Sequence, residues 1–258
     1  MSDDTIHEED LAEGTLLSHL VELRSRLLRT AAAVVVVFVV LLPFSRQIFG
    51  FVSEPLRAVL PGNQMIATAV ASPLLTPFKL TFFVALFVAM PVVLYQTWAF
   101  VAPGLYRREK RFAMPLLASS ILLFYLGVAF AYFVVFPLIF GFFTAVAPDG
   151  VEVMTDISQY LDFITMLVLA FGLAFEVPVA TVLLVWTGLT NLQKLGKARP
   201  YVFLTAFVVG MLLTPPDFIS QTLLAVPVYL LYEVGILMAR VFTRKPAQAD
   251  DEPVTTDS

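Results

Sequence analysis

The sequence predicts an all-α integral membrane protein with six transmembrane helices and both termini in the cytoplasm. Of its 258 residues, 59% are hydrophobic and only 14% are charged, against about half and about a quarter in a soluble domain. The apolar residues fall into six runs, and lysine and arginine residues concentrate in alternate segments between those runs. The first feature indicates a membrane protein, and the other two set its spans and orientation.

Six apolar runs define the predicted spans. A bilayer core about 30 Å thick requires about 20 mostly apolar residues per helix. The runs cover residues 27–44, 80–101, 112–146, 163–189, 201–213 and 218–239. The fifth has only about 13 apolar residues, or about 20 Å of helix. We expect helices five and six to be short, with the bilayer thinned beside them or neighbouring helices sheltering them.

The basic residues fix the predicted orientation, because cytoplasmic loops carry an excess of lysine and arginine. With the N-terminus inside, the cytoplasmic segments contain 13 of the 16 basic residues: Arg24, Arg26, Arg29, Arg107, Arg108, Lys110, Arg111, Lys194, Lys197, Arg199, Arg240, Arg244 and Lys245. The outer side has only Arg46, Arg57 and Lys79. An even number of spans then returns the C-terminus to the cytoplasm.

The two ends of the chain are acidic and lack apolar periodicity, which is typical of disordered segments. Half of the 20 acidic residues lie in them, so the net charge of −4 hides a basic membrane-associated body. We predict a disordered tail over residues 1–14, one six-helix membrane domain over 15–242, and a second disordered tail over 243–258.

The composition argues against covalent chemistry. The chain has no cysteine, and its only histidines, His7 and His19, lie outside the apolar runs. A phosphate-binding loop, a nucleophile with a base, and a pair of metal ligands are all missing from the pattern. We therefore predict a protein that is not an enzyme, holds no metal or cofactor, and binds no nucleic acid.

Glu176 is the most unusual residue, because it stands well inside the fourth apolar run and precedes Pro178. A carboxylate there must be protonated, paired or in contact with water. One interpretation is a neutral carboxyl group hydrogen-bonded to a neighbouring helix, with Gln221 of the sixth run as a polar neighbour. The other is a role in substrate passage or in contact with a partner.

Prolines stand within or beside the predicted spans and predict bent helices. They are Pro43, Pro91, Pro115, Pro137, Pro178 and Pro227.

Three further acidic residues, Glu22, Glu109 and Asp217, stand outside the predicted spans and have both a structural and a functional interpretation. Glu109 lies among four bases in the second cytoplasmic segment, and Glu22 lies among Arg24, Arg26 and Arg29. The two could together receive a basic ligand, or they could form surface ion pairs of little energetic value. Asp217 follows two prolines in the outer turn between the last spans, where an aspartate is also common as a turn or capping residue.

The sequence resembles the TatC family, the large polytopic subunit of the twin-arginine protein translocase. The resemblance runs over about residues 18–242. It rests on HLVELRSRLL (19–28), Ser72 and Pro73 with Lys79, YQTWAFVAP (95–103), YRREKR (106–111), FAYFVVFP (130–137), FEVP (175–178), RPY (199–201) and TPPD (214–217).

The resemblance implies a receptor for the paired arginines of signal peptides on folded cargo, working in the bacterial cytoplasmic membrane and driven by the proton-motive force. It implies single-span partners similar to TatA and TatB, and a homo-oligomer within the complex. It assigns signal-peptide binding to Glu22, Arg24, Phe100 and Glu109, partner contact to Glu176, Gln221 and Met211, and outer-loop roles to Pro55 and Asp217.

A different class of function also fits a six-span protein with one buried acid. In a proton-coupled small-solute transporter, Glu176 would carry the proton. Such a protein usually shows more polar residues near the membrane midplane and a repeated half, and the sequence shows few of the former and no repeat. Binding of a twin-arginine peptide would separate the two predictions from each other.

Overall fold

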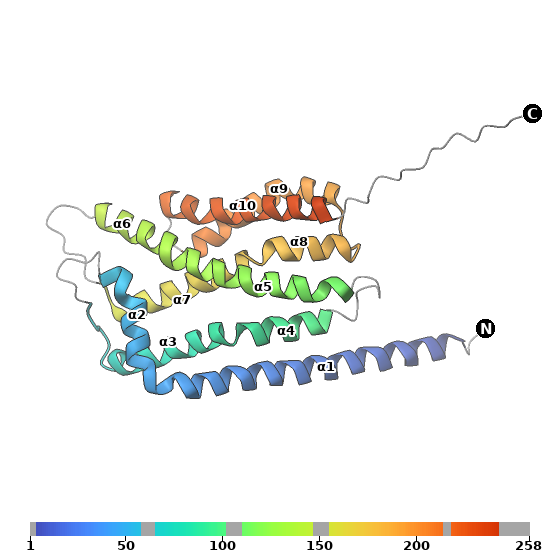
Figure 1. The fold of residues 1–258 in the computed structure, drawn as a ribbon, viewed down its shortest axis with the longest axis horizontal. Coiled ribbons are helices and arrows are strands. Elements are labelled where there is room, and N and C mark those ends of the chain that lie inside the picture. Colours follow the sequence, from blue (N-terminus) through green and yellow to red (C-terminus); the bar gives the residue numbers. More distant parts are fainter. Residues whose placement is uncertain (1–3, 58–64, 102–109, 147–154, 214–217, 243–258) are drawn as a thin grey trace, which may run out of the picture.

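The computed structural model describes residues 4–57, 65–101, 110–146, 155–213 and 218–242 (Figure 1). Within these ranges the chain is helical, apart from short connections and a single bridge between Ile66 and Asp156. The helices are α1 (Asp4–Leu41), α2 (Ser45–Arg57), α3 (Ser72–Val88), α4 (Met90–Val101), α5 (Lys110–Phe130), α6 (Phe136–Val146), α7 (Ile157–Ala174), α8 (Val177–Trp186), α9 (Leu192–Leu213) and α10 (Phe218–Phe242). A 3-10 turn, Leu42–Phe44, joins α1 to α2, and a π-helical segment, Ala131–Val135, joins α5 to α6.

The described residues give six membrane spans, as predicted. Five helical segments are long and apolar enough to cross a bilayer, and α3 and α4 together make a sixth that bends by 49°. The spans are α1, α3 with α4, α5 with α6, α7 with α8, α9, and α10. They lie roughly parallel, with α1 at one edge and α9 and α10 at the other (Figure 1).

Bends occur at several of the prolines for which the sequence analysis predicts them. Pro43 lies in the turn between α1 and α2, Pro91 follows the break at Ala89, and Pro178 follows the break at Glu176. Proline has no backbone N–H group, so it removes one hydrogen bond from the helix that contains it. The helix bends where that hydrogen bond is missing. Pro115 and Pro227 instead stand inside α5 and α10, which continue through them. Pro137 follows the π-helical segment.

Helix α2 is the main element that the sequence analysis missed. It runs across one end of the bundle, the predicted outer end, rather than along the spans (Figure 1), and packs on α3 and α6. Its apolar residues lie on one side and its polar residues on the other, as in helices that lie in the plane of a membrane surface. Pro55, predicted to lie in an outer loop, is inside this helix.

The last two spans are the shortest of the six, as predicted. Helices α9 and α10 have 22 and 25 residues. At 1.5 Å per residue α9 is about 33 Å long, so it is long enough to cross a bilayer as a helix. Its apolar part is shorter than that, because the first turns carry Lys194, Lys197 and Arg199.

The first helix begins at Asp4, so it includes most of residues 1–14, for which the sequence predicts a disordered tail. Glu8, Glu9, Leu11, Ala12 and Glu13 are good helix formers, which is consistent with this extension. The domain boundary at residue 15 stays a prediction. The second predicted tail, 243–258, lies outside the described residues.

The protein core lies where α5, α6 and α7 meet. Phe124, Phe136 and Phe171 are among its largest fully buried side chains. At two points glycine allows close packing: a Cβ on Gly127 would come within 2.6 Å of the carbonyl oxygen of Phe171, and one on Gly172 within 2.6 Å of the Phe124 ring. These two close approaches hold α5 against α7.

Candidate functional site

Glu22 lies on α1 at the predicted cytoplasmic end of the bundle. Its Oε1 accepts hydrogen bonds from Nε of Arg26, at 3.0 Å, and from Nη2 of Arg26, at 2.5 Å. Nη1 of Arg26 also donates to Oε1 of Gln96 on α4, at 3.3 Å. Arg26 therefore fixes the Glu22 carboxylate and ties α1 to α4 at the same point.

The other predicted peptide-binding residues lie around this pair or outside the described chain. Phe100 is partly buried one helical turn beyond Gln96, near the end of α4, and Arg24 is exposed on α1. Glu109 lies outside the described residues. The structure thus brings Glu22 close to the helix that carries Phe100, while the predicted pairing of Glu22 with Glu109 stays a prediction.

Glu176 occupies the break between α7 and α8, inside the fourth span. Its Oε2 accepts a hydrogen bond from the Ser120 hydroxyl of α5, and that hydroxyl lies 3.5 Å from Nε1 of Trp98, on α4. Its Oε1 is buried and has no hydrogen-bond partner among the described residues. The carboxyl group therefore does bond to a neighbouring helix, and its second oxygen is left for another group.

The predicted polar neighbour of Glu176 has a different partner. Nε2 of Gln221 donates to the carbonyl oxygen of Phe207, at 2.8 Å, and so joins α10 to α9. Met211 is half exposed on α9. Asp217 lies outside the described residues. Gln221 and Met211 thus belong to the α9–α10 pair rather than to the surroundings of Glu176.

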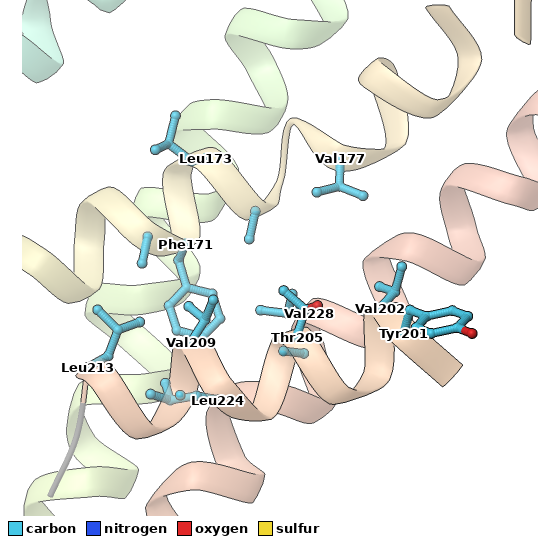
Figure 2. A pocket seen from close by; sticks show the side chains of 14 residues that line it. Phe171, Leu173, Val177, Tyr201, Val202, Thr205, Val209, Leu213, Leu224 and Val228 are labelled. Atoms are coloured by element: carbon cyan, nitrogen blue, oxygen red, sulfur yellow. The ribbon is translucent and has the colours of Figure 1, made fainter. Parts of the chain in front are cut away.

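An apolar groove with a volume of about 410 Å³ lies between α7, α9 and α10. Tyr201 and Val202 line one end and Leu213 the other, with Phe171 and Leu224 also lining it (Figure 2). Nearly all of its lining is apolar. A groove of this kind inside a membrane can take an apolar helix or a lipid chain, and it has no row of polar groups for a small solute.

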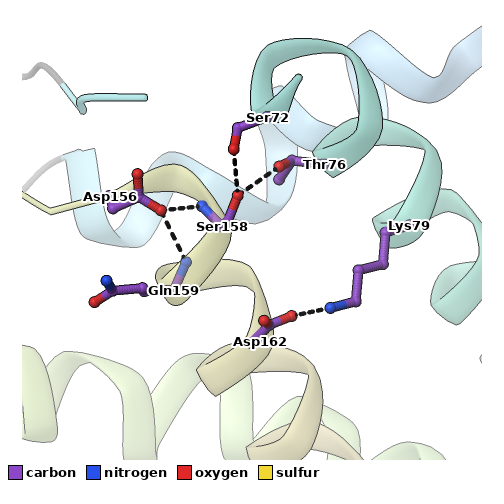
Figure 3. Close-up of polar contacts among 7 residues, drawn as sticks. All are labelled: Ser72, Thr76, Lys79, Asp156, Ser158, Gln159 and Asp162. Atoms are coloured by element: carbon purple, nitrogen blue, oxygen red, sulfur yellow. Dashed lines mark hydrogen bonds and ion pairs between the residues drawn. The ribbon is translucent and has the colours of Figure 1, made fainter. Parts of the chain in front are cut away.

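A cluster of polar contacts joins α3 to α7 at the predicted outer end of the bundle (Figure 3). The Ser158 hydroxyl lies 2.8 Å from that of Ser72 and 3.1 Å from that of Thr76. Nearer the membrane interior, Lys79 makes an ion pair with Asp162. The sequence analysis noted Lys79 as an outer basic residue and as part of the family resemblance, but it did not single out Asp162 as its partner.

Asp156 caps α7 beside this cluster. Its Oδ1 accepts hydrogen bonds from the backbone amides of Ser158 and Gln159, at 2.8 and 3.2 Å. Its Oδ2 accepts from the backbone amide and the hydroxyl of Thr68, at 2.8 and 2.7 Å. These hydrogen bonds lower the pKa of Asp156 to about 2, and the largest contribution comes from the Thr68 hydroxyl, followed by the Thr68 backbone amide.

Glu233 is an acidic residue inside the last span, in α10. The sequence analysis did not single it out. Its carboxylate accepts from Nε and Nη2 of Arg199, at 2.7 and 2.8 Å, and from the Tyr229 hydroxyl, at 2.9 Å. A bidentate arginine contact is the strongest kind of carboxylate ion pair. It joins α9 to α10, and the distance of 34 residues between the partners explains why the sequence alone did not reveal it.

No group of three or more histidine, aspartate or glutamate side chains among the described residues could hold an ion.

The chain is similar to one well-defined set of proteins. Residues 18–227 match the family model described as "Sec-independent protein translocase protein (TatC)". A protein of that name from Azotobacter chroococcum is 61% identical over 240 residues, covering 92% of this chain and 94% of the relative. The one from Escherichia coli K12 is 58% identical over 231 residues, covering 89% and 90%.

A solved structure agrees with these sequence relatives. The crystal structure titled as the twin-arginine translocase receptor TatC is 36% identical and superposes with a TM-score of 0.79, covering 88% of this chain and all of that one. The fold, the length and the sequence therefore match together over nearly the whole chain. This multi-pass membrane protein belongs to the TatC family of Sec-independent protein translocase proteins.

Proposed function

We propose that this chain receives the paired arginines of signal peptides and forms the core of a translocase that exports folded proteins. In this proposal it works in the bacterial cytoplasmic membrane, with both termini inside, and the proton-motive force drives transport. The observation that carries the proposal is the position of Glu22. Its side chain is 39% exposed, yet Arg26 and Gln96 hold it beside α4.

An acid in this setting suits an arginine ligand. Guanidinium groups stay charged and bind carboxylates through two parallel hydrogen bonds, whereas lysine acts as a point charge. Arg26 already donates twice to Oε1 of Glu22, so an incoming guanidinium would bond to Oε2 of Glu22 with one N–H group and direct its others to a second carboxylate. Glu109, from the cytoplasmic segment that follows α4, would supply the second carboxylate, and Phe100 an apolar surface beside it.

Partner subunits fit the proposal through the outer half of the bundle. The groove between α7, α9 and α10 is apolar and open to the membrane, which suits a single-span helix of a TatA-like or TatB-like subunit. Gln221 and Met211 lie on the two helices that border it, and the predicted partner contact of Glu176 would be made near Val177, which follows it in the chain and lines the groove. Several copies of the chain would assemble in one complex.

A proton-coupled solute transporter is less well supported. The grooves of about 410 and 570 Å³ are both lined almost entirely by apolar side chains. A solute site needs several convergent polar groups.

The test is the affinity of a twin-arginine peptide for the purified chain in nanodiscs. Glu22→Gln and Glu109→Gln should each weaken binding about tenfold, since a charge-assisted hydrogen bond contributes about 1.5–3 kcal/mol. The double variant should bind more weakly still, and a twin-lysine peptide should lose little from either change.

The matched control is Glu54→Gln, which alters an exposed glutamate on α2 at the opposite end of the bundle. It should leave the affinity unchanged. Unaltered binding by a folded Glu22, Glu109 double variant would reduce both residues to surface ion pairs and would overturn the receptor assignment.

A further inference from the structure

A second groove, which we call the α2 groove, lies beneath the crosswise helix α2. Its volume is about 570 Å³. Phe51 and Val52 of α2 form its roof, Val84 of α3 and Ala129 of α5 its sides, and Thr165 of α7 part of its floor. Because these helices form membrane spans, the groove lies in the outer half of the bilayer and opens towards lipid.

Two tyrosines hold the groove in shape. The hydroxyl of Tyr132 donates to the carbonyl oxygen of Phe51, at 2.8 Å, and the two rings stack at 5.6 Å. The hydroxyl of Tyr125 donates to the carbonyl oxygen of Phe87, at 3.1 Å. The first contact links the roof to one side, and the second links the two sides. A groove that is held open in this way needs no rearrangement to bind a ligand.

The charges around the groove favour an anionic head group at one end. Of the three outer basic residues, Lys79 is paired with Asp162. Arg46 and Arg57 stand at opposite ends of α2, are exposed, and form no salt bridge among the described residues. Arg46 directly precedes Gln47, which lines the groove.

Glu54, the only acid on α2, lies two helical turns beyond Arg46. About 12 Å therefore separates the two along the helix. An anionic head group would avoid Glu54 and settle at the Arg46 end.

The floor supplies one polar contact. The Thr165 hydroxyl is buried and has no hydrogen-bond partner among the described residues. A buried hydroxyl without a partner destabilises the folded protein, because it has lost its hydrogen bonds to water. An acceptor carried by a ligand, such as the ester carbonyl of a phospholipid, would satisfy it.

We propose that the α2 groove is a binding site for an anionic phospholipid of the outer leaflet. The phosphate lies at Arg46 and Gln47, an ester carbonyl accepts from Thr165, and an acyl chain fills the space between α3 and α5. The site is independent of peptide reception, which lies at the other end of the bundle.

The test uses phosphatidylglycerol with a photoactivatable diazirine in one acyl chain, diluted into phosphatidylcholine nanodiscs that contain the full chain. After illumination, mass spectrometry should find labels concentrated on peptides of α3, α5 and α7 that line the groove. Ala129→Phe, which fills the groove, should reduce this labelling at least fivefold. Ala118→Phe, at an exposed alanine on the same helix, should not.

Two milder variants test the polar contacts without filling the groove. Arg46→Gln should remove most of the preference for labelled phosphatidylglycerol over equally labelled phosphatidylcholine, while Arg57→Gln at the far end of α2 should keep it. Thr165→Val should lower labelling about threefold to tenfold.

Each contrary result has a definite meaning. Labels spread evenly over all lipid-facing helices, or undiminished in folded Ala129→Phe, would overturn the site. An equal preference in Arg46→Gln and wild type would overturn the head-group assignment. Loss of labelling on assembly with other translocase subunits would show that a protein helix occupies the groove.

Discussion

A carboxyl group inside an apolar helix is tolerated when it is neutral, paired or in contact with water, and Glu176 meets this need through Ser120. Glu176 lies at the break between α7 and α8, and Ser120 is buried within α5. The two helices therefore meet at this hydrogen bond. The Trp98 ring lies beyond Ser120 and extends the contact to a third span. A change at Glu176 should therefore affect α4, α5 and α7 together.

Asp156 allows a prediction about pH. Its folded-state pKa of about 2 lies below the ordinary value of 3.8, so its hydrogen bonds stabilise the fold fully above pH 3.8 and are lost as the pH falls through about 2. Asp156→Asn keeps an N-cap acceptor but loses an acceptor for Thr68. Its thermal unfolding midpoint should lie below that of the wild type at pH 6.

The difference between the two midpoints should shrink as the pH falls below 3.8, because the Asp156 carboxyl group of the unfolded chain then binds protons more readily than that of the folded protein, which is protonated only near pH 2. Thr68→Val removes one of the donors and should weaken this pH dependence, measured between pH 6 and 2.5 in detergent. A difference that stays constant over that range would show that the charge of Asp156 does not stabilise the fold.

The sequence pointed to a candidate functional residue only where the charge or polarity of that residue differed from that of its neighbours. Glu22, Glu109 and Glu176 each break a basic or apolar context, and the structure confirms that Glu176 bonds to a neighbouring helix. The partners could not be predicted, because Ser120 is 56 residues away from Glu176 and Thr68 is 88 away from Asp156. An ordinary serine or threonine carries no local signal of such a contact.

At the scale of helices, hydropathy identified the spans because each must hold about 20 apolar residues. It placed the start of the second span at residue 80, whereas α3 begins at Ser72. The first two turns of α3 carry Thr76 and Lys79, whose polar groups bond to α7, so a hydropathy criterion rejects them. Helix α2 was missed for a similar reason, because an in-plane amphipathic helix has little net hydrophobicity.

Glycine controls the approach of α10 to α8. A Cβ on Gly235 would lie 3.0 Å from the Cα of Pro178 and would collide with the Thr181 hydroxyl oxygen. Gly235→Ala should therefore force the two helices apart and lower the free energy of unfolding by about 1–3 kcal/mol. The measurement is denaturant unfolding in a mixed micelle, followed by circular dichroism.

Gly141→Ala is the matched control, because a Cβ at Gly141 of α6 meets no atom within 4 Å. It should be neutral or slightly stabilising, since alanine favours the helix by about 1 kcal/mol. Equal stability of the two variants would mean that α8 and α10 can separate at no cost.

At the scale of the whole molecule, the two ends of the bundle carry different side chains. One end holds Glu22, Gln96 and Phe100, together with the first turns of α9, which carry Lys194, Lys197 and Arg199. The opposite end holds α2, the Asp156 cap and the Lys79–Asp162 ion pair, which joins α3 to α7. The apolar grooves lie along the flanks of the bundle. In the proposed function, the first end offers charge to a peptide, and the flanks offer apolar surface to lipid or to partner helices.

The orientation of this molecule in the membrane is open to a direct test, because the natural chain has no cysteine. The asymmetry of the basic residues predicts that Asn63 and Asp149, in segments outside the described residues, face the outside. Single cysteines there should react in intact cells with a membrane-impermeant maleimide, as should one at the fully exposed Val70. A cysteine at Gly196, between Lys194 and Lys197 of α9, should react only after the membrane is opened.

Each variant should still bind a twin-arginine peptide, which shows that it is folded. Labelling of Gly196→Cys from outside, with protection of the other three, would reverse the orientation and place Glu22 on the wrong side to meet a peptide in the cytoplasm.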